Sequence, residues 1–154
     1  MVFDLVLFSH VALSIVAFGP TFVFPIWLAL ARRAGPSAPP FAVHAVITIA
    51  ERLLVPLAIL VPATGIALIA ETRTDWLHTG WLLASMALYA LAFGVATALG
   101  LPNARRILAL SEGGPDPEAQ AEVRRRALWQ AVYGYAINLL VLAVLALMVF
   151  KPGA

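Results

Sequence analysis

The sequence contains no cysteine among its 154 residues. This absence excludes disulfide bonds, zinc sites with cysteine ligands, iron–sulfur clusters and thiol nucleophiles. Charged residues are also scarce, because they make up 12% of the chain, against about 25% in ordinary soluble domains. Hydrophobic residues account for 62% of the sequence, and the mean hydropathy is +0.94. This composition predicts an integral membrane protein whose main partner is the lipid bilayer.

Motifs of soluble enzymes are missing as well. The chain has no HExxH, no GxSxG and no phosphate loop, and its uncharged runs hold no paired carboxylates. Its length supports a single transmembrane domain, 1–154, without a separate aqueous module, so we lean against an enzyme. The formal net charge of +2 does not indicate nucleic-acid binding, because the arginines flank apolar runs, where the positive-inside rule explains them.

Long apolar runs are what the sequence has instead. The first, from Leu5 to Ala31, holds 27 residues without a charge, and a bilayer core of roughly 30 Å needs about 20 helical residues. It is too long for a signal peptide, and the only early charge is that of Asp4. We predict four spans, at about 3–31, 41–70, 76–104 and 127–150. Their short connections predict an all-α, up-down four-helix bundle.

Basic residues are unevenly distributed around these spans. In an up-down bundle, spans one and three finish at the same end at which spans two and four begin. Seven arginines belong to this end: Arg32, Arg33, Arg105, Arg106 and Arg124 to Arg126. Only Arg73 and Lys151 fall at the other end. By the positive-inside rule, both chain termini lie on the outer side of the membrane.

His10 is the one histidine that the sequence places deep inside a span. An ionisable side chain in a membrane is costly and is a functional hypothesis by default. Helical spacing places it on one face with Ser14, Phe18, Thr21 and Pro25, and we predict that this face looks into the protein. Proline removes a backbone donor and bends a helix, so we expect neighbouring side chains to satisfy the carbonyls freed in this span.

Further polar residues have predicted local roles. Glu51 and Arg52 are neighbours about 100° apart on a helix and cannot pair well, so each is expected to have a partner on another helix or to face the cytoplasmic boundary. Asp116 is predicted to cap the last helix, with Pro117 at its first position. Glu122 is expected to pair with Arg125 or Arg126 in a solvated extension of that helix, and Asn138 to form a buried polar contact.

The third span carries a ladder of small residues four apart, Ala90, Gly94 and Ala98. Such ladders let another helix approach closely, which makes this span a candidate for the central packing element. An alanine-rich sequence also produces such ladders by chance, so both interpretations remain.

Imidazole and thioether groups are the candidate ligands. At about 1.5 Å rise per residue, His10 lies about 11 Å below the outer end of its span and Met86 about 15 Å below that of its own. Met148 adds a second thioether on the same side, and this donor set suits Cu(I) or a haem with histidine and methionine ligands. The candidate metal ligands are therefore His10, Met86 and Met148, with Ser14 able to orient the histidine. The alternatives for the histidine are structural hydrogen bonds alone or the handling of protons or small molecules, and the alternative for the methionines is packing alone.

Several stretches carry a resemblance to known families. The chain resembles a four-helix bacterial integral membrane family of unknown function. The stretches that carry the resemblance are a histidine early in span one followed by FGPTFVFPIW, then RLLVPLAILVPATG in span two and a terminal MVFKP. That family is similar in outline to the membrane part of the copper-resistance D proteins and to the membrane-bound protoporphyrinogen oxidase, which binds haem through a first-helix histidine. The resemblance implies a bacterial inner membrane protein in which His10 binds haem and Arg52 is a basic cofactor-binding position. The oxidase's third-span lysine has no counterpart here.

Two classes of function follow from these observations. One is a small membrane protein that binds haem or copper through His10. The other is a non-catalytic accessory subunit that packs against a larger membrane complex, or a homo-oligomer, through its small-residue faces.

Overall fold

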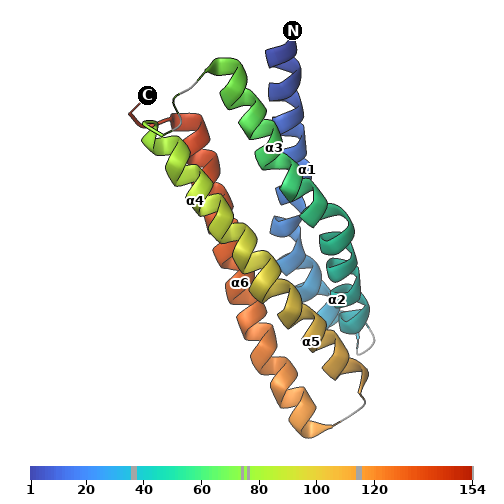
Figure 1. Ribbon diagram of the computed structural model, residues 1–154. Helices are drawn as coiled ribbons and strands as arrows, with labels where there is room; N and C mark the ends of the chain where they lie inside the picture. Colours follow the sequence, from blue (N-terminus) through green and yellow to red (C-terminus); the bar gives the residue numbers. More distant parts are fainter. Residues whose placement is uncertain (36–37, 74, 76, 114–115, 154) are drawn as a thin grey trace.

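The computed structural model describes residues 1–35, 38–73, 75, 77–113 and 116–153, and Figure 1 shows them as a bundle of long helices. The α-helices are α1 (Val2–Arg33), α2 (Ala38–Ile49), α3 (Val55–Thr72), α4 (Gly80–Gly94), α5 (Leu101–Glu112) and α6 (Pro117–Phe150). Two π-helical segments, η1 (Ala50–Leu54) and η2 (Val95–Gly100), join α2 to α3 and α4 to α5. No strand occurs among the described residues, so the predicted all-α class is confirmed.

Four continuous helical stretches are long and apolar enough to cross a membrane: Val2–Arg33, Ala38–Thr72, Gly80–Glu112 and Pro117–Phe150. They run alternately up and down (Figure 1), which confirms the predicted four-helix bundle. The stretches extend beyond several predicted span ends. The third continues through Arg105 and Arg106 to Glu112, and it begins at Gly80, whereas the predicted first residue, Trp76, lies outside the described residues.

The start of α6 is specified by its cap, as predicted. The Asp116 carboxylate accepts hydrogen bonds from the backbone N–H groups of Glu118 and Ala119, both at 3.2 Å, which supplies acceptors for two otherwise unpaired donors. Pro117 occupies the first helical turn. The helix therefore begins ten residues before the apolar run from Ala127, and its arginines project from a helix.

Each π-helical segment ends two residues before a proline. In η1 the bond runs from Val55 N–H to the Ala50 carbonyl, next to Pro56, and in η2 it runs from Leu101 N–H to the Ala96 carbonyl, next to Pro102. The wider π turn adjusts the backbone where proline interrupts the α-helical bonding pattern. Helices α2 and α5 are each 12 residues long and pack on each other. The two π segments therefore lie at a similar level of the bundle.

Figure 1 places both termini and the connection between α3 and α4 at one end of the bundle, the terminal end. The opposite end, where α1 and α5 finish and α6 starts, holds the seven arginines and is here the arginine-rich end. In packing, α1 lies mainly against α3, and α4 lies mainly against α6.

Small side chains form much of the packed interior: Ala17, Ala42, Ala58, Ala92 and Ala104 are buried. The predicted small-residue ladder does not belong to this interior. Ala90 and Ala98 are exposed, and no heavy atom lies within 4 Å of a Cβ built on Gly94. The ladder therefore faces away from the bundle, while other residues of the same span, among them Leu82 and Ala92, pack inside it.

Candidate functional site

His10 lies on α1 and faces α3 at the centre of a small hydrogen-bonded cluster. Its Nδ1 is 3.1 Å from the Val61 carbonyl oxygen and 2.9 Å from Thr64 Oγ1. The Thr64 hydroxyl in turn donates to the Val61 carbonyl at 2.8 Å. Since this leaves the Thr64 oxygen as an acceptor, both neighbours of Nδ1 accept, and the network assigns the ring proton to Nδ1.

The opposite ring nitrogen, Nε2, then carries the lone pair. Among the described residues, no hydrogen bond occupies Nε2. Gly65 lies beside the ring, and a Cβ built at that position would be in ordinary van der Waals contact with His10 Cε1, at 3.5 Å. An imidazole whose other nitrogen donates to a backbone carbonyl is the usual arrangement of a metal-ligating histidine.

Two other residues on the predicted inner face of α1, Phe18 and Thr21, also contact neighbouring helices. The Phe18 ring meets the Tyr89 ring edge to face, with centroids 6.0 Å apart. The Thr21 hydroxyl lies 2.9 Å from Asn138 Oδ1, in agreement with the polar contact expected of Asn138. Ser14 donates to the His10 carbonyl at 2.7 Å, so its hydroxyl bonds to the backbone beside the ring. This face of α1 does look into the protein.

The remaining candidate ligands are placed less centrally. Met86 lies one helical turn before Tyr89 on α4 and is 43% exposed. Met148 is partly buried near the end of α6. Within the described ranges no group of three or more histidine, cysteine or carboxylate residues could hold a metal. Of these three candidate ligands, His10 is the one whose second ring nitrogen is held by hydrogen bonds from a neighbouring helix.

Glu51 has the interhelical partner that its position predicts, and Arg52 does not. The Glu51 carboxylate binds the guanidinium of Arg105 on α5, with Oε1 2.8 Å from Nε and 2.7 Å from Nη2. Arg52 is exposed, and no ion pair or side-chain hydrogen bond joins it to another residue in the described part of the chain. Glu51 thus links η1 to α5, while the neighbouring Arg52 is exposed at the surface of the bundle.

Two backbone carbonyls freed by prolines are bonded by side chains from other helices. The Tyr89 hydroxyl donates to the Ala58 carbonyl, which lies four residues before Pro62 and so lacks its helical donor. The Asn138 amide approaches the Thr21 carbonyl, four residues before Pro25, at 3.5 Å. The expectation made for the first span is confirmed at Thr21, and the Ala58 carbonyl shows the same arrangement in the second span, for which no such expectation was made. The prolines identify the acceptors in the sequence, but nothing in the sequence identifies Tyr89 as a donor.

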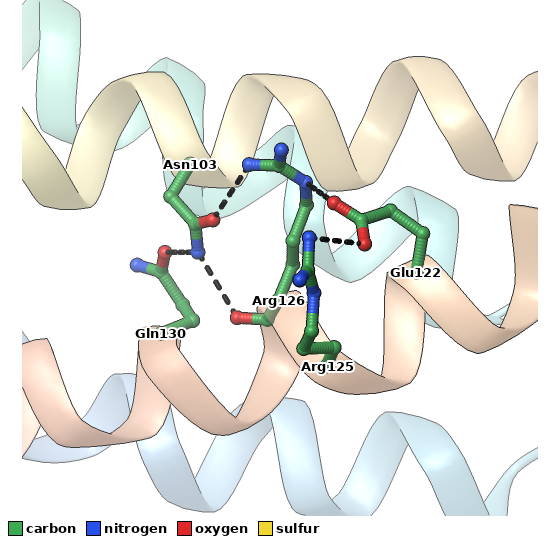
Figure 2. Close-up of polar contacts among 5 residues, drawn as sticks. All are labelled: Asn103, Glu122, Arg125, Arg126 and Gln130. Carbon is green, nitrogen blue, oxygen red and sulfur yellow. Dashed lines mark hydrogen bonds and ion pairs between the residues drawn. The ribbon is translucent and has the colours of Figure 1, made fainter.

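A polar cluster joins α5 to α6 near the arginine-rich end (Figure 2). Asn103 Nδ2 donates to Gln130 Oε1 at 2.9 Å and to the Arg126 carbonyl at 3.0 Å, and Arg126 Nη1 donates to Asn103 Oδ1 at 3.2 Å. Glu122 pairs with Arg126 at 2.6 Å and with Arg125 at 2.7 Å. The expected pairing of Glu122 is confirmed for both arginines, whereas sequence analysis missed the role of Asn103.

A family model described as "Predicted integral membrane protein (DUF2269)" matches residues 4–152. No curated protein and no solved structure matches the chain. The match agrees with the four membrane-crossing stretches described above.

Proposed function

This chain belongs to that family of predicted integral membrane proteins, and we propose that it holds a haem or copper cofactor in the membrane through Nε2 of His10. One observation carries the proposal: Nδ1 is bonded to Val61 and Thr64 across the interface between α1 and α3, which directs the free lone pair to Nε2. Such hydrogen bonds fix the tautomer and the ring orientation of a ligating histidine.

The donor set restricts the cofactor. A neutral imidazole ligates copper or haem iron, and a methionine thioether is a soft ligand for Cu(I) and an axial ligand of haem iron in cytochromes c. Met86 and Met148 supply the thioethers of this proposal. Because Met86 is 43% exposed, a cofactor that it ligates lies at the surface of the bundle, against lipid or a second copy. Arg52 offers an exposed positive charge for an acidic group such as a haem propionate.

An absorption spectrum and a metal analysis of the mildly solubilised protein test this proposal. Cells are supplied with a haem precursor and with copper, and we expect either a Soret band or bound copper. His10→Ala should lose the cofactor, and His44→Ala should keep it, because His44 is exposed near the arginine-rich end. Wild-type protein with neither haem nor copper would contradict the proposal, as would full cofactor occupancy in the His10→Ala variant.

The alternative function is that of a non-catalytic accessory subunit in a larger membrane complex or homo-oligomer. The outward-facing ladder of Ala90, Gly94 and Ala98 favours it, because small residues on a free helix face admit a second helix closely. Under this alternative, a partner or a second copy co-purifies in a fixed ratio, and Gly94→Leu disrupts the association. Gly134→Leu is the matched control, since Gly134 is also free of neighbours within 4 Å.

We further propose that both termini face the outer side of a bacterial inner membrane. The seven arginines at the opposite end support this orientation. The chain has no cysteine, so Leu77→Cys and Glu112→Cys each introduce a single thiol at opposite ends of the bundle. A membrane-impermeant maleimide should label Leu77→Cys in intact cells and Glu112→Cys only after the cells are opened. The reverse pattern would contradict the orientation.

A further inference from the structure

A pocket of about 550 Å³ lies between α1 and α6, away from the His10 cluster. Its walls are largely apolar and include Phe22, Pro25 and Ile26 from α1 and Tyr135, Asn138 and Leu142 from α6. Phe22 lies about one turn before Pro25 and Ile26, and Tyr135, Asn138 and Leu142 are three or four apart, so each helix contributes one face to the pocket. His10 lies more than three helical turns from Phe22 along α1, so the two sites are separate.

The position of this pocket across the membrane restricts which ligands can enter it. Asn138 lies midway along the uncharged run from Ala127 to Phe150, at about 18 Å from either end of that run. This position corresponds to the middle of a bilayer core of roughly 30 Å. Charged lipid headgroups stay at the bilayer surface, so a ligand at this depth is neutral and arrives through the lipid phase.

Asn138 supplies the pocket with a hydrogen-bond donor. Thr21 Oγ1 lies 2.9 Å from Asn138 Oδ1 and 2.7 Å from the Phe18 carbonyl oxygen, so its one proton is shared between two acceptors, and Asn138 Nδ2 reaches the Thr21 carbonyl only at 3.5 Å. The amide has two N–H groups, and the described residues offer no acceptor to the second one. Water does not satisfy such a group in the hydrocarbon layer. A ligand with an oxygen acceptor removes this deficit.

Aromatic side chains occur on both walls. Phe22 belongs to α1, and Tyr135 lies one turn before Asn138 on α6. Flat rings pack favourably against such side chains, and the tyrosine hydroxyl adds a second polar group at the exposed rim. We propose that the pocket binds a neutral, lipid-soluble carbonyl compound with a planar ring, the chemistry of a membrane quinone, whose carbonyl oxygen accepts from Asn138 Nδ2.

Photolabelling of the protein in nanodiscs with an azidoquinone tests this proposal. We expect labelled peptides from α1 and α6 at the pocket. Decylubiquinone should compete with the label, and decylbenzene, which has the chain and a ring without carbonyls, should not. Leu142→Trp fills the pocket and should reduce specific labelling by at least tenfold. Leu145→Trp is the matched control, because Leu145 is exposed on the same helix and does not line the pocket.

Asn138→Leu tests the hydrogen bond itself. Loss of one neutral hydrogen bond should weaken competition by decylubiquinone by about threefold to tenfold. The same labelling in the His10→Ala variant separates this site from the proposed cofactor site, since binding here does not require His10. Labelling spread over the lipid-facing surface, equal competition by decylbenzene, or unchanged labelling in Leu142→Trp would each overturn the proposal.

Discussion

The arginine-rich end and the interior of the bundle join their helices by different interactions. At the arginine-rich end, charged groups cross between helices, as Glu51 does with Arg105. In the interior, neutral side chains bond to backbone carbonyls, as Tyr89 does at Ala58 and His10 does at Val61. The difference follows from solvation, because a charge at the bilayer centre is costly, whereas a freed carbonyl there has no water and needs a protein donor.

Asn103 lies where the two kinds of interaction meet. It is a neutral side chain, yet its partners include the guanidinium and the carbonyl of Arg126 as well as the side chain of Gln130. This amide satisfies several polar groups at once between α5 and α6. The comparison therefore predicts that one neutral residue in this position is worth more to stability than an exposed ion pair.

The largest effect is expected for Asn103→Leu. The substitution removes the partner of Gln130 Oε1 and of Arg126 Nη1, and unpaired polar groups away from water cost about 1–3 kcal/mol each. We expect the free energy of unfolding to fall by about 2–3 kcal/mol. Unfolding by dodecyl sulfate in mixed micelles measures it. Ser111→Ala is the control, because among the described residues the Ser111 hydroxyl bonds to the Ile107 carbonyl of its own helix and to no other helix. Equal stability of the two variants would refute the special role of Asn103.

A smaller effect is expected for Tyr89→Phe, about 1 kcal/mol. The lost donor leaves the Ala58 carbonyl unpaired, since Pro62 has no N–H group. In a Pro62→Ala background, the restored helix N–H bonds to that carbonyl, so the same tyrosine substitution should cost much less. A double-mutant cycle measures this coupling. The same cost in both backgrounds would show that the Tyr89 hydroxyl does not act through the Ala58 carbonyl.

The smallest effect is expected for Arg105→Gln, about 0.5 kcal/mol. The ion pair with Glu51 is partly exposed, with side-chain exposures of 59% and 36%, and salt should weaken it further. Arg52→Gln should change stability less, because Arg52 is exposed and forms no ion pair with any described residue. A greater loss for Arg52→Gln than for Arg105→Gln would reverse this part of the comparison.

The architecture could be predicted because it depends on features that are local in sequence. Uncharged runs gave the four crossing stretches, and the Asp116 and Pro117 pair gave the start of α6. The polar segment around Arg105 and Arg106 was harder, because arginines at a membrane edge suit either a connection or an extended helix. Its helical form follows from the continuation of the third stretch through η2 into α5.

For the His10 cluster, the sequence predicted the side contributed by α1 but not the side contributed by α3. Spacing along α1 placed His10 on an inward face, but its partner Thr64 depends on the rotation of α3, which no short pattern encodes. The same uncertainty affects the ladder at Gly94. Spacing identifies a helix face of small residues, but it does not say whether that face looks into the bundle or away from it. The π segments before Pro56 and Pro102 were not predicted, since proline marks a disturbance without specifying its form.

Chemical rescue of a His10→Gly variant tests the central claim most directly. This substitution removes the imidazole and leaves space beside Gly65, which already lies against the ring in the wild-type protein. The account predicts that His10→Gly lacks haem and copper and that added imidazole restores the absorption band or the bound metal. Retention of wild-type cofactor content by His10→Gly without imidazole would contradict ligation by His10.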